Sequence, residues 1–356
     1  LLRQEVGDSL HTASTARGLF LWGGSGLQEE RLFTADSSNT NCPAATSDGN
    51  YVVFTTDAAL VEDDTNGGND VYAAIRVGDS WVFQRMSVTA TGVQILGDTM
   101  PLFDRSALLD QPLTRFGTPV VSYDDTYGLQ VVFVSNGTNL PGASANTAYA
   151  YLRRVQGGTT ETFRVGARHV TGETGDPGPC FSPDISGDGR LIVFVTDDPY
   201  IAIDTGADGK KHVYVTDRDG SLVNDTQPGY SLVDRTATGL PGNGDSLAPR
   251  LSGDGRFVVF RSRATDLVPS VGTKGKYQIY VHDRDTQTTH CVSAVAQEGG
   301  DADSYAPGIS PTGRYVTFIS RAANLGSDTG FLQVYRVDRG EYYANHPPTV
   351  ADRQES

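Results

Sequence analysis

A short unit recurs along the chain, and it constrains the fold more than any other feature of the sequence. Its clearest form is Ser-Gly-Asp-Gly-Arg followed by five apolar, mostly β-branched residues, found at 186–195 and, with an arginine at the last position, at 252–261. Residues 310–319 vary the motif to Ser-Pro-Thr-Gly-Arg, and shorter forms stand at 47–54 and 122–133. The phenylalanines that mark these runs are Phe54, Phe133, Phe194, Phe260 and Phe318. Their spacing gives a repeat of about 60 residues with one longer interval.

Each repeat predicts four antiparallel strands. Asp-Gly favours the tight turn of a hairpin, so the segment before it and the apolar run after it read as paired strands. The apolar run lacks alternation, which indicates burial on both faces. A third strand carrying a tyrosine follows each run, and a more polar fourth strand follows most of them. Four-stranded sheets repeated around an axis form a β-propeller, so we expect an all-β fold of this type.

The two ends of the chain must complete the ring. Five full repeats and a short first blade at residues 7–40 give six blades, with the propeller spanning residues 1–340. The last repeat shows three strands, so we expect the N-terminal strand at residues 1–6 to supply its fourth strand and close the ring. Residues 92–118 form an insertion, expected as a short helix on one mouth of the propeller, and residues 341–356 are expected to be a Pro-containing linker or tail.

Composition excludes several classes of function. The chain of 356 residues has a formal net charge of −15 and a pI of about 4.7, so its surface repels the phosphate backbone of nucleic acids. No apolar run approaches the roughly 18–20 residues that span a bilayer. The three cysteines have none of the spacings of zinc or haem sites.

The order Pro, Ser, Asp-Gly-Arg, Val-x-Phe and Asp-x-Tyr-Val resembles the WD40-like repeats of TolB-type propellers over residues 41–339. Residues 59–72 resemble a bacterial version of that repeat with Asp-Thr-Asn-Gly before Asp-Val-Tyr. The resemblance implies an extracytoplasmic location: periplasmic, secreted or on the cell surface. It implies no catalytic set, because such propellers host receptors, scaffolds and enzymes alike.

The best candidate for a ligand site is the loop at residues 62–70. Asp64, Asn66 and Asp70 place oxygen ligands on a turn made flexible by glycine, which suits calcium. The alternative is a turn rich in Asp and Asn whose acids are solvated. A second loop at residues 204–209 has a similar composition.

No catalytic motif stands out. The six histidines lack metal-binding spacing, no Gly-x-Ser-x-Gly occurs, and acid pairs such as Asp197 and Asp198 point to opposite faces if they lie on a strand. We therefore expect a non-enzymatic binding or scaffold module that contacts a protein partner or a surface glycan. The alternative is a polysaccharide lyase or glycosidase, which clustered Tyr, His, Arg and Asp at one mouth of the channel would favour.

Overall fold

In the computed structural model, the described residues are 2–6, 10–15, 18–23, 28–33, 40–97, 99, 118–144, 147–166, 178–198, 201, 209–217, 229–326 and 331–340. Apart from a single 3-10 turn at Ala323–Leu325, the regular structure of these residues is β-strand. No helix among them is long and apolar enough to cross a membrane.

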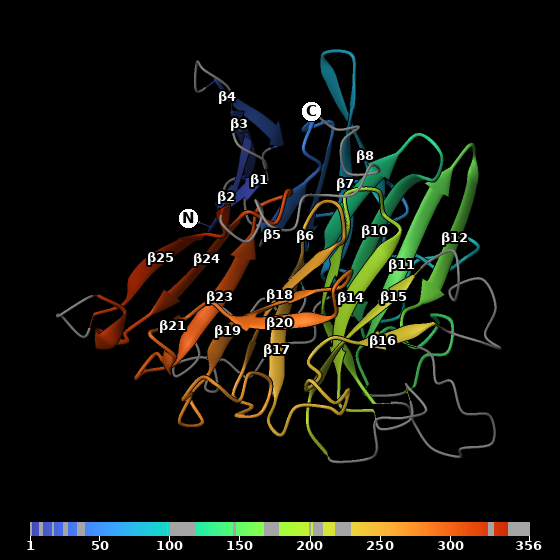
Figure 1. Ribbon diagram of the computed structural model, residues 1–356. Helices are drawn as coiled ribbons and strands as arrows, with labels where there is room; N and C mark the ends of the chain where they lie inside the picture. The colour runs from blue at the N-terminus through green and yellow to red at the C-terminus, as the bar shows by residue number, and fades with distance from the viewer. Residues whose placement is uncertain are drawn as a thin grey trace.

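The strands form successive sheets of neighbours in sequence (Figure 1). The first sheet contains β1 (Leu2–Val6), β2 (Leu10–Thr15), β3 (Gly18–Gly23) and β4 (Gln28–Phe33). The second contains β5 (Thr40–Ala45), β6 (Tyr51–Thr56), β7 (Asp70–Val77) and β8 (Ser80–Arg85). The third contains β9 (Val120–Asp124), β10 (Gly128–Ser135), β11 (Tyr149–Gln156) and β12 (Thr159–Arg164).

The second half of the chain continues the series. The fourth sheet contains β13 (Cys180–Ile185), β14 (Leu191–Thr196), β15 (His212–Asp217) and β16 (Tyr230–Leu232). The fifth contains β17 (Ser246–Leu251), β18 (Phe257–Ser262), β19 (Gln278–Asp283) and β20 (Thr288–Cys291). The sixth contains β23 (Ser304–Ile309), β24 (Tyr315–Ser320) and β25 (Gln333–Asp338), and a small hairpin of β21 (Ala294–Val295) and β22 (Glu298–Gly299) precedes it.

The core lies between successive sheets, as the apolar runs predict. Every residue of β10, β14 and β18 is buried, because each of these strands is covered on both faces. Within each repeat the ring of the marker phenylalanine packs against the ring of the tyrosine opposite it in the third strand, stacked in four repeats and tilted in the third sheet. These pairs are Phe54–Tyr72, Phe133–Tyr151, Phe194–Tyr214, Phe260–Tyr280 and Phe318–Tyr335, with ring centroids 5.1 to 6.3 Å apart.

Neighbouring sheets are joined where their first two strands turn. The Gly187 N–H donates to the Gly253 carbonyl at 2.8 Å, and the Gly253 N–H donates to the Pro311 carbonyl at 2.7 Å. The first strands also pack in series, β13 on β17 and β17 on β23. The first strands therefore lie side by side, as repetition around an axis requires.

Closure of the ring by the N-terminal strand is not what the structure shows. The strand at Leu2–Val6 pairs with β2, and Leu10–Thr15 pairs in turn with β3, so the first sheet has four strands of its own and is not abbreviated. The described part of the sixth sheet has three strands. Pairing consecutive strands closes only a short loop, whereas pairing with the last sheet must close nearly the whole chain at a greater entropic cost. The expected insertion helix and the tail at 341–356 lie outside the described residues, apart from positions 92–97, 99 and 118.

Candidate functional site

The predicted loop lies at one end of the sheets, which we call the loop end. The strands alternate in direction, so the starts of first and third strands meet the ends of second and fourth strands there. The Asp-Gly turns lie at the opposite end, the turn end. The loop at residues 62–69 connects β6 to β7 and therefore lies at the loop end.

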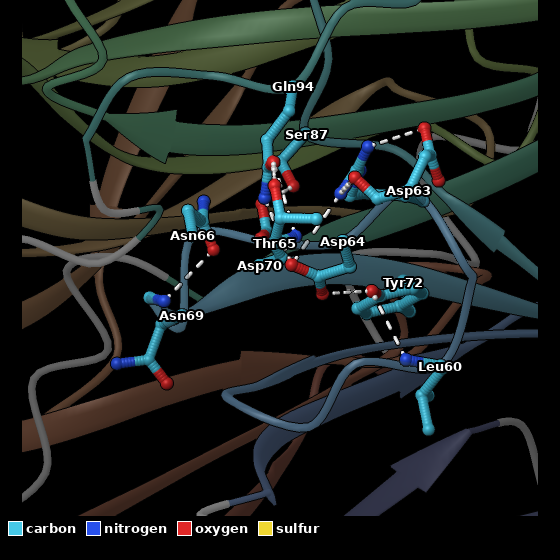
Figure 2. Close-up of polar contacts among 12 residues, drawn as sticks. Leu60, Asp63, Asp64, Thr65, Asn66, Asn69, Asp70, Tyr72, Ser87 and Gln94 are labelled. Carbon is cyan, nitrogen blue, oxygen red and sulfur yellow. Dashed lines mark hydrogen bonds and ion pairs between the residues drawn. The ribbon is translucent and has the colours of Figure 1, made fainter.

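Asp64 is held by protein donors on both carboxylate oxygens (Figure 2). The Tyr72 hydroxyl donates to Oδ2, and Gln94 Nε2 donates to Oδ1 at 2.9 Å. Gln94 also accepts from the backbone and hydroxyl of Thr65 through Oε1, so it fastens the loop to the segment after β8. Burial raises the pKa of Tyr72, and its bond to Asp64 adds to the effect. Tyr72 therefore stays a neutral donor.

Arg85 supplies positive charge beneath the loop. Its guanidinium is buried and donates to the exposed Asp63 carboxylate at 2.7 Å and to the Asp63 carbonyl at 3.2 Å. Its Nη1 also lies 3.6 Å from Asp64 Oδ1. The arginine at the end of β8 thus neutralises part of the acidic loop from inside.

Asp70, at the start of β7, is fully buried. Its Oδ1 accepts from the Ser87 hydroxyl at 2.5 Å, and Ser87 Oγ accepts the Val71 N–H at 3.0 Å. No hydrogen bond reaches Asp70 Oδ2. Burial raises the pKa of Asp70, and the nearby charge of Asp64 raises it further, while the Ser87 bond, Arg85 and the side chain of Asn66 oppose the shift.

Asn66 is exposed, and its Oδ1 accepts the Gly68 N–H at 2.9 Å. The three predicted calcium ligands thus share one loop and its adjoining strand, with Asp64 and Asp70 inside and Asn66 outside. Among the described residues, no group of three or more His, Cys, Asp or Glu side chains could hold a metal ion. Calcium binding stays a prediction. In the second candidate loop, residues 204–208 lie outside the described residues.

A second cluster at the loop end was not anticipated from the sequence. Arg261 is buried at the end of β18, with its guanidinium carbon 4.8 Å from the ring centroid of Tyr277 and 5.5 Å from that of Tyr305. Asp303 accepts the Tyr277 N–H at 2.8 Å, and burial lowers the pKa of Arg261. The signal for it was the arginine itself, which stands where the other apolar runs carry Val, Ile or Thr.

Three short hairpins between sheets also lie at the loop end, because each follows a fourth strand. They are bridged at Val88–Gln94, Arg235–Pro241 and Ala294–Gly299. Each presents an exposed apolar side chain: Val93 is 58% exposed, Leu240 61% and Val295 53%. The first two hairpins repeat the sequence Thr-Ala-Thr-Gly, at 89–92 and 236–239, and this repetition is the sequence signal that marks them.

The described histidines of the third strands form contacts within their own sheets. His212 Nδ1 lies 2.8 Å from Asp234 Oδ2, with both side chains buried. His282 contacts the Thr289 hydroxyl at 3.0 Å, and burial lowers its pKa to about 4. Asp198, from the acid pair, accepts the Gly178 N–H at 3.0 Å. These contacts tie strands together and do not converge on a common point.

No protein-family model and no curated protein sequence matches the chain. Solved structures resemble it at low identity. An oligogalacturonate lyase from Vibrio parahaemolyticus is 13% identical with a TM-score of 0.51, covering 95% of this chain and 77% of the lyase. A puromycin-hydrolyzing peptidase from Mycobacterium tuberculosis is 13% identical with a TM-score of 0.52, covering 95% of this chain and 43% of the peptidase.

The third structure is the β-propeller domain of the Trilobed protease from Pyrococcus furiosus, described as having an open velcro topology. It is 8% identical with a TM-score of 0.50, covering 92% of this chain and 74% of the domain. At such identities the likeness concerns the fold alone. Together with the repeated four-stranded antiparallel sheets, it shows that this chain has a β-propeller fold.

Proposed function

We propose that this protein is a binding or scaffold module that contacts a protein partner or a surface glycan through its loop end. The observation that carries this proposal is an exposed apolar side chain on each of the three hairpins between sheets. Val93, Leu240 and Val295 stand on short, hydrogen-bonded hairpins. Ordered loops lose little entropy on association, so apolar side chains that they expose at one end of the molecule can contribute to binding a partner.

The charged groups at the loop end support binding more than catalysis. Each carboxylate oxygen of Asp64 accepts a hydrogen bond from a protein donor, and Arg85 donates to Asp63. A catalytic acid or base needs a free position from which it can reach a substrate. The polar network therefore fits a role in holding the loops in shape for a partner.

The repeat pattern supports a more specific classification, which is part of the proposal. We infer a TolB-type propeller in which the six sheets are six blades. The resemblance of residues 41–339 to extracytoplasmic repeats supports a periplasmic, cell-surface or secreted location.

The test compares two apolar-to-polar variants in native extracts and on a glycan array. Leu240→Ser alters the loop end, while Val77→Ser is the matched control, because Val77 is 59% exposed but lies at the turn end of β7. We expect the wild type and Val77→Ser to retain the same partner or glycan and Leu240→Ser to lose it. The proposal is contradicted if the wild type is recovered only as an isolated monomer. It is also contradicted if both variants capture the partner or glycan equally well.

The cluster of Arg261, Tyr277 and Tyr305 favours a second candidate function, a polysaccharide lyase or glycosidase. Arginine can bind a sugar carboxylate and tyrosine can transfer protons, and the similar Vibrio structure is an oligogalacturonate lyase. Incubation with neutral and acidic oligosaccharides, oligogalacturonates included, tests it. If the wild type releases a product and Tyr305→Phe does not, the result supports an enzyme. If the wild type releases no product from any of these substrates, the enzyme hypothesis is rejected.

A further inference from the structure

The unsatisfied oxygen of Asp70 is the feature of the loop end that the proposed function leaves unexplained. The side chain is fully buried, and Oδ2 receives no hydrogen bond from the protein. Burying an ionised carboxylate oxygen without a partner is costly, so such an oxygen normally faces a proton, a cation or water.

Equivalent positions in two other repeats are satisfied by protein groups. Gln278 begins β19 as Asp70 begins β7. Its Oε1 accepts from the Ser293 hydroxyl at 2.7 Å and from the Gly300 N–H at 3.0 Å, and its Nε2 donates to the Gly300 carbonyl at 2.9 Å. The fourth repeat places His212 there, 2.8 Å from Asp234. At this position the side chains of these two repeats are bonded to other groups of the protein, whereas one oxygen of Asp70 is not.

We propose that Asp70 Oδ2 is a ligand of a calcium ion, with side-chain oxygens of Asp64 and Asn66 completing the protein's share of the site. Carboxylate and amide oxygens are the donors that this hard cation prefers, and it accepts six to eight oxygen ligands in flexible geometry. Loop carbonyls and water supply the remainder. The site is independent of the partner-binding role proposed above.

The surroundings of Asp70 fit this assignment. Asp64 is oriented by Tyr72 and Gln94, and its negative charge acts on Asp70. Arg85 directs its hydrogen bonds to Asp63, so the positive charge present does not satisfy Asp70 Oδ2. Asn66 and Gly67 are exposed, so an ion can reach this part of the loop from solvent.

The experiment measures the melting temperature of the chelator-treated protein during titration with CaCl₂, and the luminescence of Tb³⁺ added in place of calcium. Asp70→Asn removes the proposed ligand but keeps an oxygen to accept from Ser87, so it should fold. Asp63→Asn is the matched control, because it removes the same charge from an exposed carboxylate of the same loop.

We expect calcium to raise the melting temperature of the wild type by about 2–5 °C at saturation. Tb³⁺ luminescence excited through tyrosine should appear as well, since Tyr72 contacts Asp64. Asp63→Asn should keep both responses and Asp70→Asn should lose both. Absence of both responses in the wild type overturns the proposal, and so does their survival in Asp70→Asn. The proposal is also overturned if calcium has no effect on the wild type and Asp70→Asn raises the melting temperature, because Asp70 is then a buried neutral acid.

Discussion

Arg85 neutralises the inner side of an acidic loop, and its burial determines how much it matters. Its guanidinium meets Asp63 at 2.7 Å and lies 3.6 Å from the buried Asp64 carboxylate. Removing one member of a buried pair leaves the other charge unsatisfied, which costs more than the pair contributes when intact. The same chemistry at the surface, as in the exposed pair of Arg190 and Asp217, contributes little.

Arg85→Met should therefore lower the free energy of unfolding by about 3 kcal/mol. Arg190 Nη2 lies 2.7 Å from Asp217 Oδ2 in a partly exposed ion pair, so Arg190→Met should lower the free energy of unfolding by less than about 1 kcal/mol. Urea unfolding of the two variants beside the wild type provides the comparison. Equal losses would show that burial does not control the contribution of Arg85.

His282 links the stability of the fifth sheet to pH. Burial lowers the pKa of His282 from 6.5 to about 4. Between these values the unfolded chain binds a proton that the folded protein excludes, so stability falls as the pH decreases from about 6.5 to 4. The raised pKa values of Asp70 and Asp234 act in the opposite direction, so a variant is needed to isolate the histidine.

His282→Gln should reduce the loss of stability across this window by roughly 3 kcal/mol, because the shift of about 2.5 pKa units no longer contributes. The measurement is urea unfolding at half-unit steps from pH 7 to pH 4. A variant that loses stability as steeply as the wild type would show that His282 does not titrate on unfolding.

At the scale of the strand, the first strand of four sheets carries the same irregularity. Cys42, Ser182, Ala248 and Ala306 each precede a proline and adopt φ values of 48–53°. In each case the register with the second strand shifts at this point, as in a β-bulge. The bulge interrupts the ladder where proline has no N–H to donate, which allows proline inside a strand that neighbours cover on both sides.

Glycines with positive φ recur in the turns between strands, and two of them, Gly313 in the turn of the last repeat unit and Gly275 in the loop before β19, have different requirements. Gly313 has a φ of 74°, and a Cβ there would lie 2.2 Å from the Phe257 ring of the preceding sheet. Gly275 has a φ of 68°, but a Cβ there would meet nothing within 4 Å. Gly313 is required both for its positive φ and for the close approach of the Phe257 ring, whereas Gly275 is required for its positive φ alone.

Gly313→Ala should therefore destabilise the protein by about 3 kcal/mol, from backbone strain and overpacking together. Gly275→Ala should cost about 1 kcal/mol from backbone strain alone. Chemical denaturation of the pair separates the two contributions. Similar losses in both variants would mean that the turn does not press on Phe257.

At the scale of the molecule, the sequence predicts the features that depend on local pattern. Asp-Gly followed by an apolar run predicts the hairpin and the doubly covered strand, and both are confirmed at Gly255 and Phe257–Ser262. Closure by the N-terminal strand is not confirmed, because it concerns which distant strands pair, and the local pattern at Leu2–Val6 carries no information on that choice. The Arg261 cluster was missed for a related reason, since its members come from three separate segments.

The sixth sheet, which has three strands among the described residues, exposes a face that the equivalent sheets bury. The residue before the stacked tyrosine is fully buried in the second to fifth sheets, at Val71, Ala150, Val213 and Ile279, because the next sheet covers it. In the sixth sheet that residue is Val334, and it is 79% exposed. Arg336 and Thr317 accompany it on the exposed side, where the other sheets carry apolar residues. The outer face of β24 and β25 is therefore more polar and more exposed than the equivalent faces of the other sheets.

A cysteine at position 334 tests this reading in solution. Val334→Cys should react with a thiol reagent as fast as Val77→Cys, whereas Ile279→Cys, at the equivalent buried position, should react at least about a hundredfold more slowly. Cys180 and Cys291 add little background, since burial raises the pKa of Cys180 to about 12 and that of Cys291 to about 11. The reaction of Cys42 is measured in the wild type and subtracted. Protection of Val334→Cys matching that of Ile279→Cys would show that another surface, from this chain or a partner, covers the sixth sheet and completes the ring.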